Sequence, residues 1–340
     1  MTSRSATVTL LGFFVATFVV LSLFVPRLAT AGNIENLMGG FSFVAILAAG
    51  QSFPMLLRGI DLSIGAIVAL AGMVTFDLAL IFHLPGWLVI PAALAAATLA
   101  GAFNGLLIVG LRLQPFIATL ATLGAYRGLV FTISGRQLVP GLSTTPIRDP
   151  WIIGLEHYVD LVALLGVPDD VRLPAIPLSF FAMIGLLLLG HTLLVTTKFG
   201  RDIYAVGGNH EAARLAGIRT GHITVAAYAI SGFCAGVAAL FLVARLTTST
   251  EALGTGMELT AIAAAVIGGV SLAGGIGSVI GPAIGAFLVG TILIGLTLLG
   301  VSQFVQQILT GLILLAAIAY DRLQVLRRRA RLSTQLVEQA

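Results

Sequence analysis

Long apolar runs, separated by short polar segments, make up most of this chain. A helix needs about 20 apolar residues to cross the hydrocarbon core of a membrane. We therefore expect residues 1–340 to form one all-α polytopic membrane domain. The pattern predicts about ten spans, at residues 8–25, 38–57, 62–82, 87–109, 115–134, 175–196, 223–243, 258–273, 278–299 and 303–320.

The eighth and ninth runs are separated only by residues 273–277, which read AGGIG. Irregular backbone at membrane depth is tolerated only where protein or water satisfies its polar groups. Residues 258–299 are therefore either two full crossings or a pair of short, re-entrant helices.

The first apolar run has the outline of a secretory signal, because it follows Arg4 and precedes an A-x-A sequence at residues 29–31. The run is longer than the apolar core of a signal peptide. We favour an uncleaved first span, and N-terminal sequencing of the purified protein distinguishes the two.

Composition excludes a soluble globule, since 58% of residues are hydrophobic and 9% are charged, whereas charged residues make up about a quarter of soluble proteins. With the N-terminus in the cytoplasm, twelve of the eighteen Lys and Arg residues lie inside and five outside, as the positive-inside rule requires. Both termini are then cytoplasmic. The net charge of +4 reflects this topology, so we expect no nucleic-acid partner. The basic tail at 321–340 is expected to lie against anionic membrane lipid.

Signals for catalysis, metals and nucleotides are missing from the sequence. Cys234 is the single cysteine, and the five histidines have no ligand spacing, so no metal site is predicted. A P-loop needs G-x-x-x-x-G-K-[ST], but Lys198 is the only lysine and Phe199 follows it. We therefore expect no catalytic residues and no cofactor on this chain. Any ATP that drives it binds, with Mg²⁺, to a separate polypeptide.

Residues 198–222 form a charged loop between two apolar spans, and a membrane protein keeps such a segment only in water. Within the loop, E-A-A-x-x-x-G from Glu211 to Gly217 predicts a short amphipathic helix ended by glycine. From the residues alone, a helix that docks into another protein and an ordinary solvated loop remain equally open.

Five groups of motifs resemble the ribose-type monosaccharide ABC importer permeases, in that family's order from about residue 34 to 321. The chain departs from that family's usual pattern at two positions. Arg58 stands where a second glycine commonly precedes Gly59, and Thr297 stands where asparagine is frequent. The matching motifs lie at 59–65 (GIDLSIG), 104–107 with 115–120, 200–217, 254–275 and 298–301.

The resemblance implies a bacterial inner-membrane, multi-pass permease that is not itself an enzyme. It would pair with a second copy or a paralogue, with a cytoplasmic ATP-binding cassette protein, and with a periplasmic sugar-binding protein. The cargo would be a pentose, a hexose or a related polyol. The residues that match the family's ATPase-coupling loop are Gly207, Gly208, Asn209, Glu211, Ala212, Ala213 and Gly217.

The resemblance weakens at residues 135–174, an extracytoplasmic insertion too polar to span the membrane. The spacing of Ile152, Ile153, Leu155, Val159, Val162 and Leu165 predicts an amphipathic helix on the outer surface. A landing surface for the binding protein and a cap on the bundle are both open readings of this insertion.

An internal repeat is indicated by residues 45–65 and 261–281, which share nine identities in 21 positions. The predicted topology gives both segments the same orientation, as in a parallel repeat with a pathway between its halves.

Polar groups inside the spans must face a partner or a water-filled cavity. Interhelical hydrogen bonding competes with a pathway role for each of them. Asp61 is either an N-cap of the third span, accepting from the backbone of Ser63 or Ile64, or a substrate contact. Our candidates for the substrate pathway include two aromatic residues for stacking or gating, and the threonine that replaces the family's frequent asparagine. The candidates are Gln51, Phe53, Ser63, Asn104, Phe116, Thr119, Thr122, Arg127 and Thr297.

An ion-coupled secondary transporter of a small neutral solute is the alternative function. It needs an ion-binding group at mid-membrane. Asp61, Asp77, Arg127 and Glu258 are the candidates, and most lie near predicted span ends.

Overall fold

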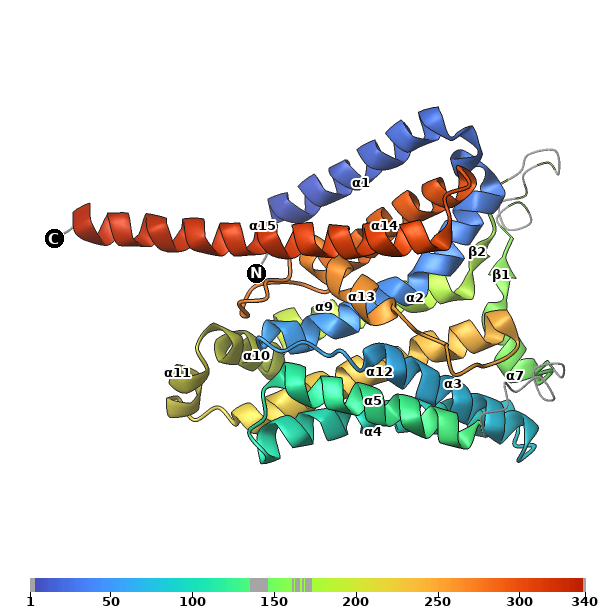
Figure 1. Cartoon of the computed structure of the whole chain (residues 1–340), viewed down its shortest axis with the longest axis horizontal. Helices are drawn as coiled ribbons and strands as arrows, with labels where there is room; N and C mark the ends of the chain where they lie inside the picture. Colours follow the sequence, from blue (N-terminus) through green and yellow to red (C-terminus); the bar gives the residue numbers. More distant parts are fainter. Residues whose placement is uncertain are drawn as a thin grey trace.

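The computed structural model describes residues 4–134, 146–160, 162, 166, 168 and 173–338. It is a bundle of helices with one two-stranded sheet at one end (Figure 1), which confirms the expected all-α polytopic fold. The elements are α1 Arg4–Phe24, η1 Pro26–Ala29, α2 Ala31–Leu56, α3 Ile64–Leu80, α4 Gly86–Gly110, α5 Pro115–Ile133, α7 Pro150–Ile153, η2 Gly154–Glu156, β1 Tyr158–Val159, β2 Ile176–Pro177, α9 Leu178–Thr196, α10 Lys198–Gly208, α11 His210–Leu215, α12 Thr220–Leu246, α13 Met257–Ile267, α14 Ile280–Leu298 and α15 Gln303–Glu338.

Eight of the described helices are long and apolar enough to cross a membrane, and α3 and α13 are shorter apolar helices. Helix α13 ends at Ile267 because Gly269 takes a left-handed conformation (φ 86°) and the N–H of Val270 donates to the carbonyl of Ala265. Helix α14 keeps 19 residues. Of the alternatives for residues 258–299, the eighth segment is therefore a short helix and the ninth a full-length one.

Helix α2 lies at the centre of the bundle, where it packs against α12, α14, α13 and α9. In its most apolar 18-residue window 83% of residues are buried, whereas the windows of α1 and α15 have none buried. Large apolar side chains on these outer helices are exposed, such as Phe24 (78%) and Phe304 (81%). Surfaces of this kind fit contact with lipid.

Helices α4 and α12 approach closely at two glycines. A Cβ at Gly101 would overlap the carbonyl oxygen of Tyr228, and a Cβ at Gly232 would overlap that of Ala97. Small residues allow such contacts in membranes, where van der Waals packing takes the place of a hydrophobic driving force between helices.

The two ends of the bundle differ. Helix α1 begins and α15 ends toward the end that carries α10 and α11, while α7, β1 and β2 lie at the opposite end (Figure 1). The predicted topology requires both termini on the side of residues 198–222. Which side of the membrane that end faces stays a prediction.

The amphipathic helix predicted through residues 152–165 is wrong over residues 154–160. Helix α7 ends at Ile153, a 3-10 turn continues to Glu156, and β1 then pairs antiparallel with β2. A continuous helix is unfavourable here, because Gly154 lowers helix stability. The backbones of Tyr158 and Val159 pair with β2 instead of continuing a helix. Leu165 and residues 135–145 lie outside the described residues.

Helices α3 and α14 start at the aligned positions Ile64 and Ile280, as a repeat of 45–65 and 261–281 would require. The preceding helices differ, since α2 runs to Leu56 while α13 stops before Leu272, the position aligned with Leu56. The repeat stays a prediction.

Candidate functional site

The charged segment 198–222 folds into two helices, where the sequence indicated one short helix within a longer polar stretch. Helices α10 and α11 meet at Asn209, whose backbone is extended. Its side-chain oxygen accepts from the N–H groups of Glu211 (3.1 Å) and Ala212 (3.0 Å). This is N-capping, which satisfies donors that have no partner within the helix. Gly217, at φ 82°, ends the α11 turn, and the chain returns to α12.

Helix α11 presents a polar face with one large apolar side chain. Glu211 and Arg214 form an exposed ion pair, and Leu215 is 77% exposed. The hydrogen bond from Arg214, together with its positive charge, lowers the pKa of Glu211 below its usual value, so this carboxylate is ionised at neutral pH. Ala212 is exposed, whereas Ala213 is buried against the chain itself. Ala212 can therefore meet a partner in this conformation, and Ala213 faces away from one.

Helix α10 rests on the end of α2 at a backbone contact. Gly207 is buried, and a Cβ there would overlap the carbonyl oxygen of Leu56. That same carbonyl accepts from the N–H of Gly275 (2.9 Å) in the loop between α13 and α14. The backbones of α2, α10 and the loop between α13 and α14, which are distant in sequence, therefore contact one another directly. We call the group Leu56, Arg58, Tyr204, Gly207 and Gly275 the α10 seat.

Arg58 lies just after α2 and binds α10 across the α10 seat. It follows the C-cap of α2 in a left-handed conformation (φ 64°), with its N–H donating to Met55 and the N–H of Gly59 donating to Pro54. This hydrogen-bonding pattern is a Schellman motif, which usually has glycine at this position. The left-handed conformation costs a non-glycine residue about 1–2 kcal/mol. The guanidinium donates from Nε to the carbonyl of Gly207 (2.9 Å) and from Nη2 to that of Gly208.

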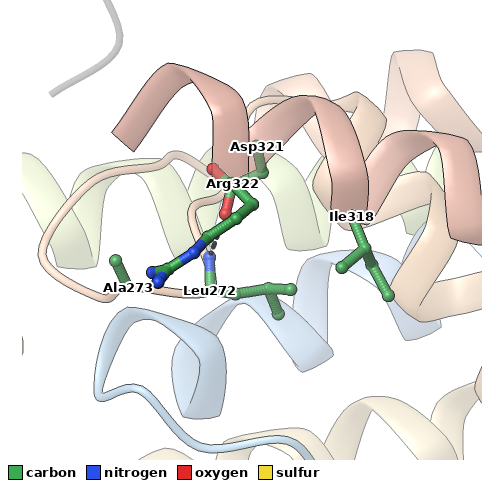
Figure 2. Close-up of a pocket in the computed structure, with 5 residues that line it drawn as sticks. All are labelled: Leu272, Ala273, Ile318, Asp321 and Arg322. Atoms are coloured by element: carbon green, nitrogen blue, oxygen red, sulfur yellow. Dashed lines mark hydrogen bonds between the residues drawn. The ribbon is translucent and has the colours of Figure 1, made fainter. Parts of the chain in front are cut away.

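The loop from Ser271 to Gly277 is held on two sides. Tyr204 of α10 donates its hydroxyl to the carbonyl of Gly277 (2.8 Å). Asp321 of α15 accepts from the N–H of Leu272 (3.2 Å) and from the hydroxyl of Ser271 (3.4 Å). Figure 2 shows Asp321 pointing toward this loop, beside a pocket of about 250 Å³ that Arg322 and Ile318 also line. Helix α15 is therefore connected to the same loop that supports α10.

A second group of polar residues surrounds Asp61, three residues after Arg58 in the turn between α2 and α3. Asp61 is fully buried. Its Oδ1 accepts from the N–H (3.0 Å) and hydroxyl (2.7 Å) of Ser63, and its Oδ2 accepts from the hydroxyl of Ser231 in α12 (3.0 Å). The predicted bond from the backbone of Ser63 is therefore present, but the N-cap of α3 is Ser63 and not Asp61. All of these donors are uncharged.

Hydrogen bonds extend this group to α4, α5 and α2. Asn104 donates to Ser63 (2.7 Å), and Tyr126 donates to Asn104 (3.2 Å). Thr119 donates to the carbonyl of Ile60 (3.0 Å). In the amide orientation that satisfies both groups, Gln51 accepts from the N–H of Asp61 (2.9 Å) and donates to its carbonyl (3.2 Å). We call these residues, with Asp61, Ser63 and Ser231, the Asp61 cluster.

Most of the predicted pathway residues therefore take part in contacts between neighbouring helices or loops. Arg127 donates to the carbonyls of Glu251 (2.6 Å) and Leu253 (2.8 Å), which fixes the loop after α12 to α5. Phe116 is half-exposed, and Thr297 is exposed at the end of α14, where it bonds Gln306 of α15. The candidates that are buried in this conformation are Gln51, Phe53, Ser63, Asn104, Thr119 and Thr122.

Several residues of these sites were not singled out from the sequence. Ser231 and Tyr126 lie within apolar helices, and the rule that intramembrane polar groups need partners applies to both. Tyr204 could not be found in this way, because its partner is a backbone carbonyl more than 70 residues away. In the described part of the chain no group of three His, Cys, Asp or Glu residues could hold a metal ion.

Comparison with known proteins gives one consistent result. The family described as "Branched-chain amino acid transport system / permease component" matches residues 33–318. The ribose import permease protein RbsC of Haemophilus influenzae is 35% identical over 303 residues, covering 89% of this chain and 88% of the relative. In Escherichia coli, the D-allose transport system permease protein AlsC is 34% identical (92% and 90% covered) and the L-arabinose transport system permease protein AraH is 33% identical (91% and 88%). No solved structure matches.

Adjacent glycines in α10 test the α10 seat. Gly207→Ala should lower the thermal unfolding midpoint of the detergent-solubilised protein, because overpacking a tight contact costs about 1–3 kcal/mol and the added methyl group meets Leu56. Gly208→Ala is the matched control, since a Cβ there has open space around it. Equal midpoints for the two variants would contradict the close contact.

Truncation of Asp61 tests the Asp61 cluster. Asp61→Ala leaves the hydroxyls of Ser63 and Ser231 without their acceptor, and each unpaired buried group costs about 1–3 kcal/mol. Asp61→Asn should be milder, because its amide oxygen still accepts. Thermal unfolding in detergent measures both, and an alanine variant as stable as the parent would show that the cluster contributes nothing.

Proposed function

Because this chain belongs to the branched-chain amino acid transport system / permease component family, and within it to the ribose-type sugar ABC permeases, we propose that it is the membrane subunit of an ATP-driven monosaccharide importer. The resemblance found in the sequence is thereby confirmed, and the protein is a multi-pass protein of the bacterial inner membrane. Its cargo in this proposal is a pentose, a hexose or a related polyol. Three of its relatives are named for the transport of ribose, D-allose and L-arabinose.

The observation that carries this proposal is the seating of the exposed α10–α11 pair on the end of the central helix α2. Glu211, Arg214 and Leu215 offer a charged and apolar surface at the tip of that pair. Since the sequence has no P-loop, ATP and Mg²⁺ would bind to a cytoplasmic cassette protein that holds this tip. Movement of the cassette would then reach α2 through short backbone contacts.

A periplasmic sugar-binding protein completes the proposed importer. It would dock at the opposite end of the bundle, where α7 and the two strands lie (Figure 1). Glu156 there accepts from Tyr158 and lies 4.0 Å from Arg245 of α12, which ties the insertion to the bundle. The described residues at this end are thus held to α12, which supports docking there.

The importer we propose contains a second permease copy. Helix α5 supports this part of the proposal, because Gly124 and Gly128 are spaced as G-x-x-x-G and a Cβ at either position has open space around it. Ala121 and Ala125 are exposed on the same face. Small residues at this spacing let two membrane helices approach closely.

Uptake by cells of the native host tests the proposal against the ion-coupled alternative. Cells that lack the chromosomal copy and carry it on a plasmid should take up at least one of labelled D-ribose, D-allose and L-arabinose. Uptake should persist when an ionophore removes ion gradients at constant ATP, and stop when ATP is depleted. Loss of uptake with ionophore alone would instead establish an ion-coupled transporter.

Reversal of charge at the tip of α11 tests the cassette contact. Glu211→Arg should reduce uptake by about tenfold or more, since a reversed charge at a docking surface costs several kcal/mol of binding. Glu211→Asp should retain most uptake. Both variants should reach the membrane at the parent's level, because Glu211 is exposed. Normal uptake by Glu211→Arg would contradict a cassette contact at this surface.

Cysteine cross-linking tests the second copy on α5. In a Cys234→Ser background, Gly124→Cys should form a disulfide-linked dimer in native membranes under mild oxidation. Leu189→Cys on the exposed face of α9 is the control, since its side chain is 69% exposed and should face lipid. Dimers from Leu189→Cys alone would place the second copy elsewhere.

A further inference from the structure

Arg58 joins the α10–α11 pair to the Asp61 cluster. We propose that this arginine is a positioning residue for energy coupling: it transmits displacement of α10 into the turn that holds α4, α5 and α12 together. This inference rests on the proposed function, and it adds a transmission residue in the α2–α3 turn to the exposed surface already proposed to meet the cassette.

The backbone at this position gives no reason for an arginine. Arg58 occupies the left-handed position of the Schellman motif after α2, and glycine takes this conformation without strain. What the arginine adds here is a set of side-chain hydrogen bonds that glycine cannot form. Gly274, packed against the arginine's Cγ, leaves room for that side chain to pass toward α10.

The side chain binds the last two residues of α10. Gly207 and Gly208 are the carboxyl end of that helix, and carbonyls in the last turn of a helix have no donor within it. The guanidinium of Arg58 supplies donors to both carbonyls, and its positive charge meets the negative end of the helix dipole. A planar fork with two bonds fixes direction as well as distance, so α10 cannot slide or tilt at this point without moving Arg58.

Two residues separate Arg58 from Asp61, and they are anchored as well. The carbonyl of Ile60 accepts from Thr119 of α5, and Asp61 accepts from Ser231 of α12. The N–H of Gly59 is bonded back to Pro54. A turn with this many fixed groups has little freedom to absorb a displacement. Movement that enters at Arg58 therefore reaches α5 and α12 through these bonds.

The chain contains a matched control for Arg58. Arg112 also follows a helix in a left-handed conformation (φ 53°), in the turn between α4 and α5. By the predicted topology that turn lies at the same end of the protein. Its side chain is exposed, and within the described residues it makes no hydrogen bond or ion pair. Arg58→Gly and Arg112→Gly therefore make the same change in the same backbone conformation, and only the first removes a connection to α10.

The test uses the assembled complex of permease, cassette and binding protein in proteoliposomes, with labelled D-ribose, D-allose and L-arabinose as a mixture. The readout is the number of sugars transported per ATP hydrolysed. Arg58→Gly should still assemble and hydrolyse ATP, while sugar transported per ATP falls about tenfold, within the usual range of coupling between sites. Arg58→Lys should lie between, because a single ammonium group cannot form the fork. Arg112→Gly should match the parent.

Three outcomes would overturn the inference. The first is a normal sugar-to-ATP ratio for Arg58→Gly, and the second is an equal fall for Arg58→Gly and Arg112→Gly. The third is an Arg58→Gly protein that melts well below the parent and loses ATP hydrolysis and transport in proportion, since that would show a purely structural role. If the parent complex itself moves no sugar in an ATP-dependent manner, the proposed function fails, and that result is distinguishable from all three.

Discussion

Contact between the backbones of Gly207 and Leu56 is the constraint on which the α11 end of this protein depends. Because glycine has no side chain, the end of α10 lies directly on the last carbonyl of α2. The loop between α13 and α14 reaches the same carbonyl through Gly275. Contacts this close leave no side chain to adjust between the segments. Displacement of α10 must therefore either move α2 and the loop with it or break the seat.

Buried polar groups inside the bundle form hydrogen bonds with groups on neighbouring helices and turns. Asp61 accepts from α12 and from its own turn, Asn104 of α4 bonds Ser63, and Thr119 of α5 bonds Ile60. In a lipid environment an unpaired polar group is costly, so these bonds select one arrangement of four helices. The same bonds would have to shift together in a transport cycle, because a half-satisfied network is unfavourable. Bonds that change together favour discrete arrangements over gradual ones, which would suit rigid-body alternation in the proposed importer.

Loops and helix ends show where sequence reasoning succeeded and where it failed. The break before α14 was visible in the glycines at 273–277, because glycine is the residue that tolerates left-handed backbone, as Gly274 and Gly275 show. The helix predicted through 152–165 failed at residues 154–160, because apolar spacing cannot reveal that Tyr158 and Val159 pair with residues 176 and 177. The pathway candidates were identified as polar groups in apolar spans, and that rule cannot distinguish a lining residue from Asn104, which bonds a neighbouring helix.

The sequence alone determined the membrane location, the all-α class, most helix positions and the family, because length and polarity of apolar runs are local properties that lipid enforces. It also marked Arg58 as unusual. Only the tertiary structure decided what Arg58 binds, because its partners Gly207 and Gly208 lie about 150 residues further along the chain. Their carbonyls carry no side-chain signature, and backbone groups of any sequence look alike until folding brings them together.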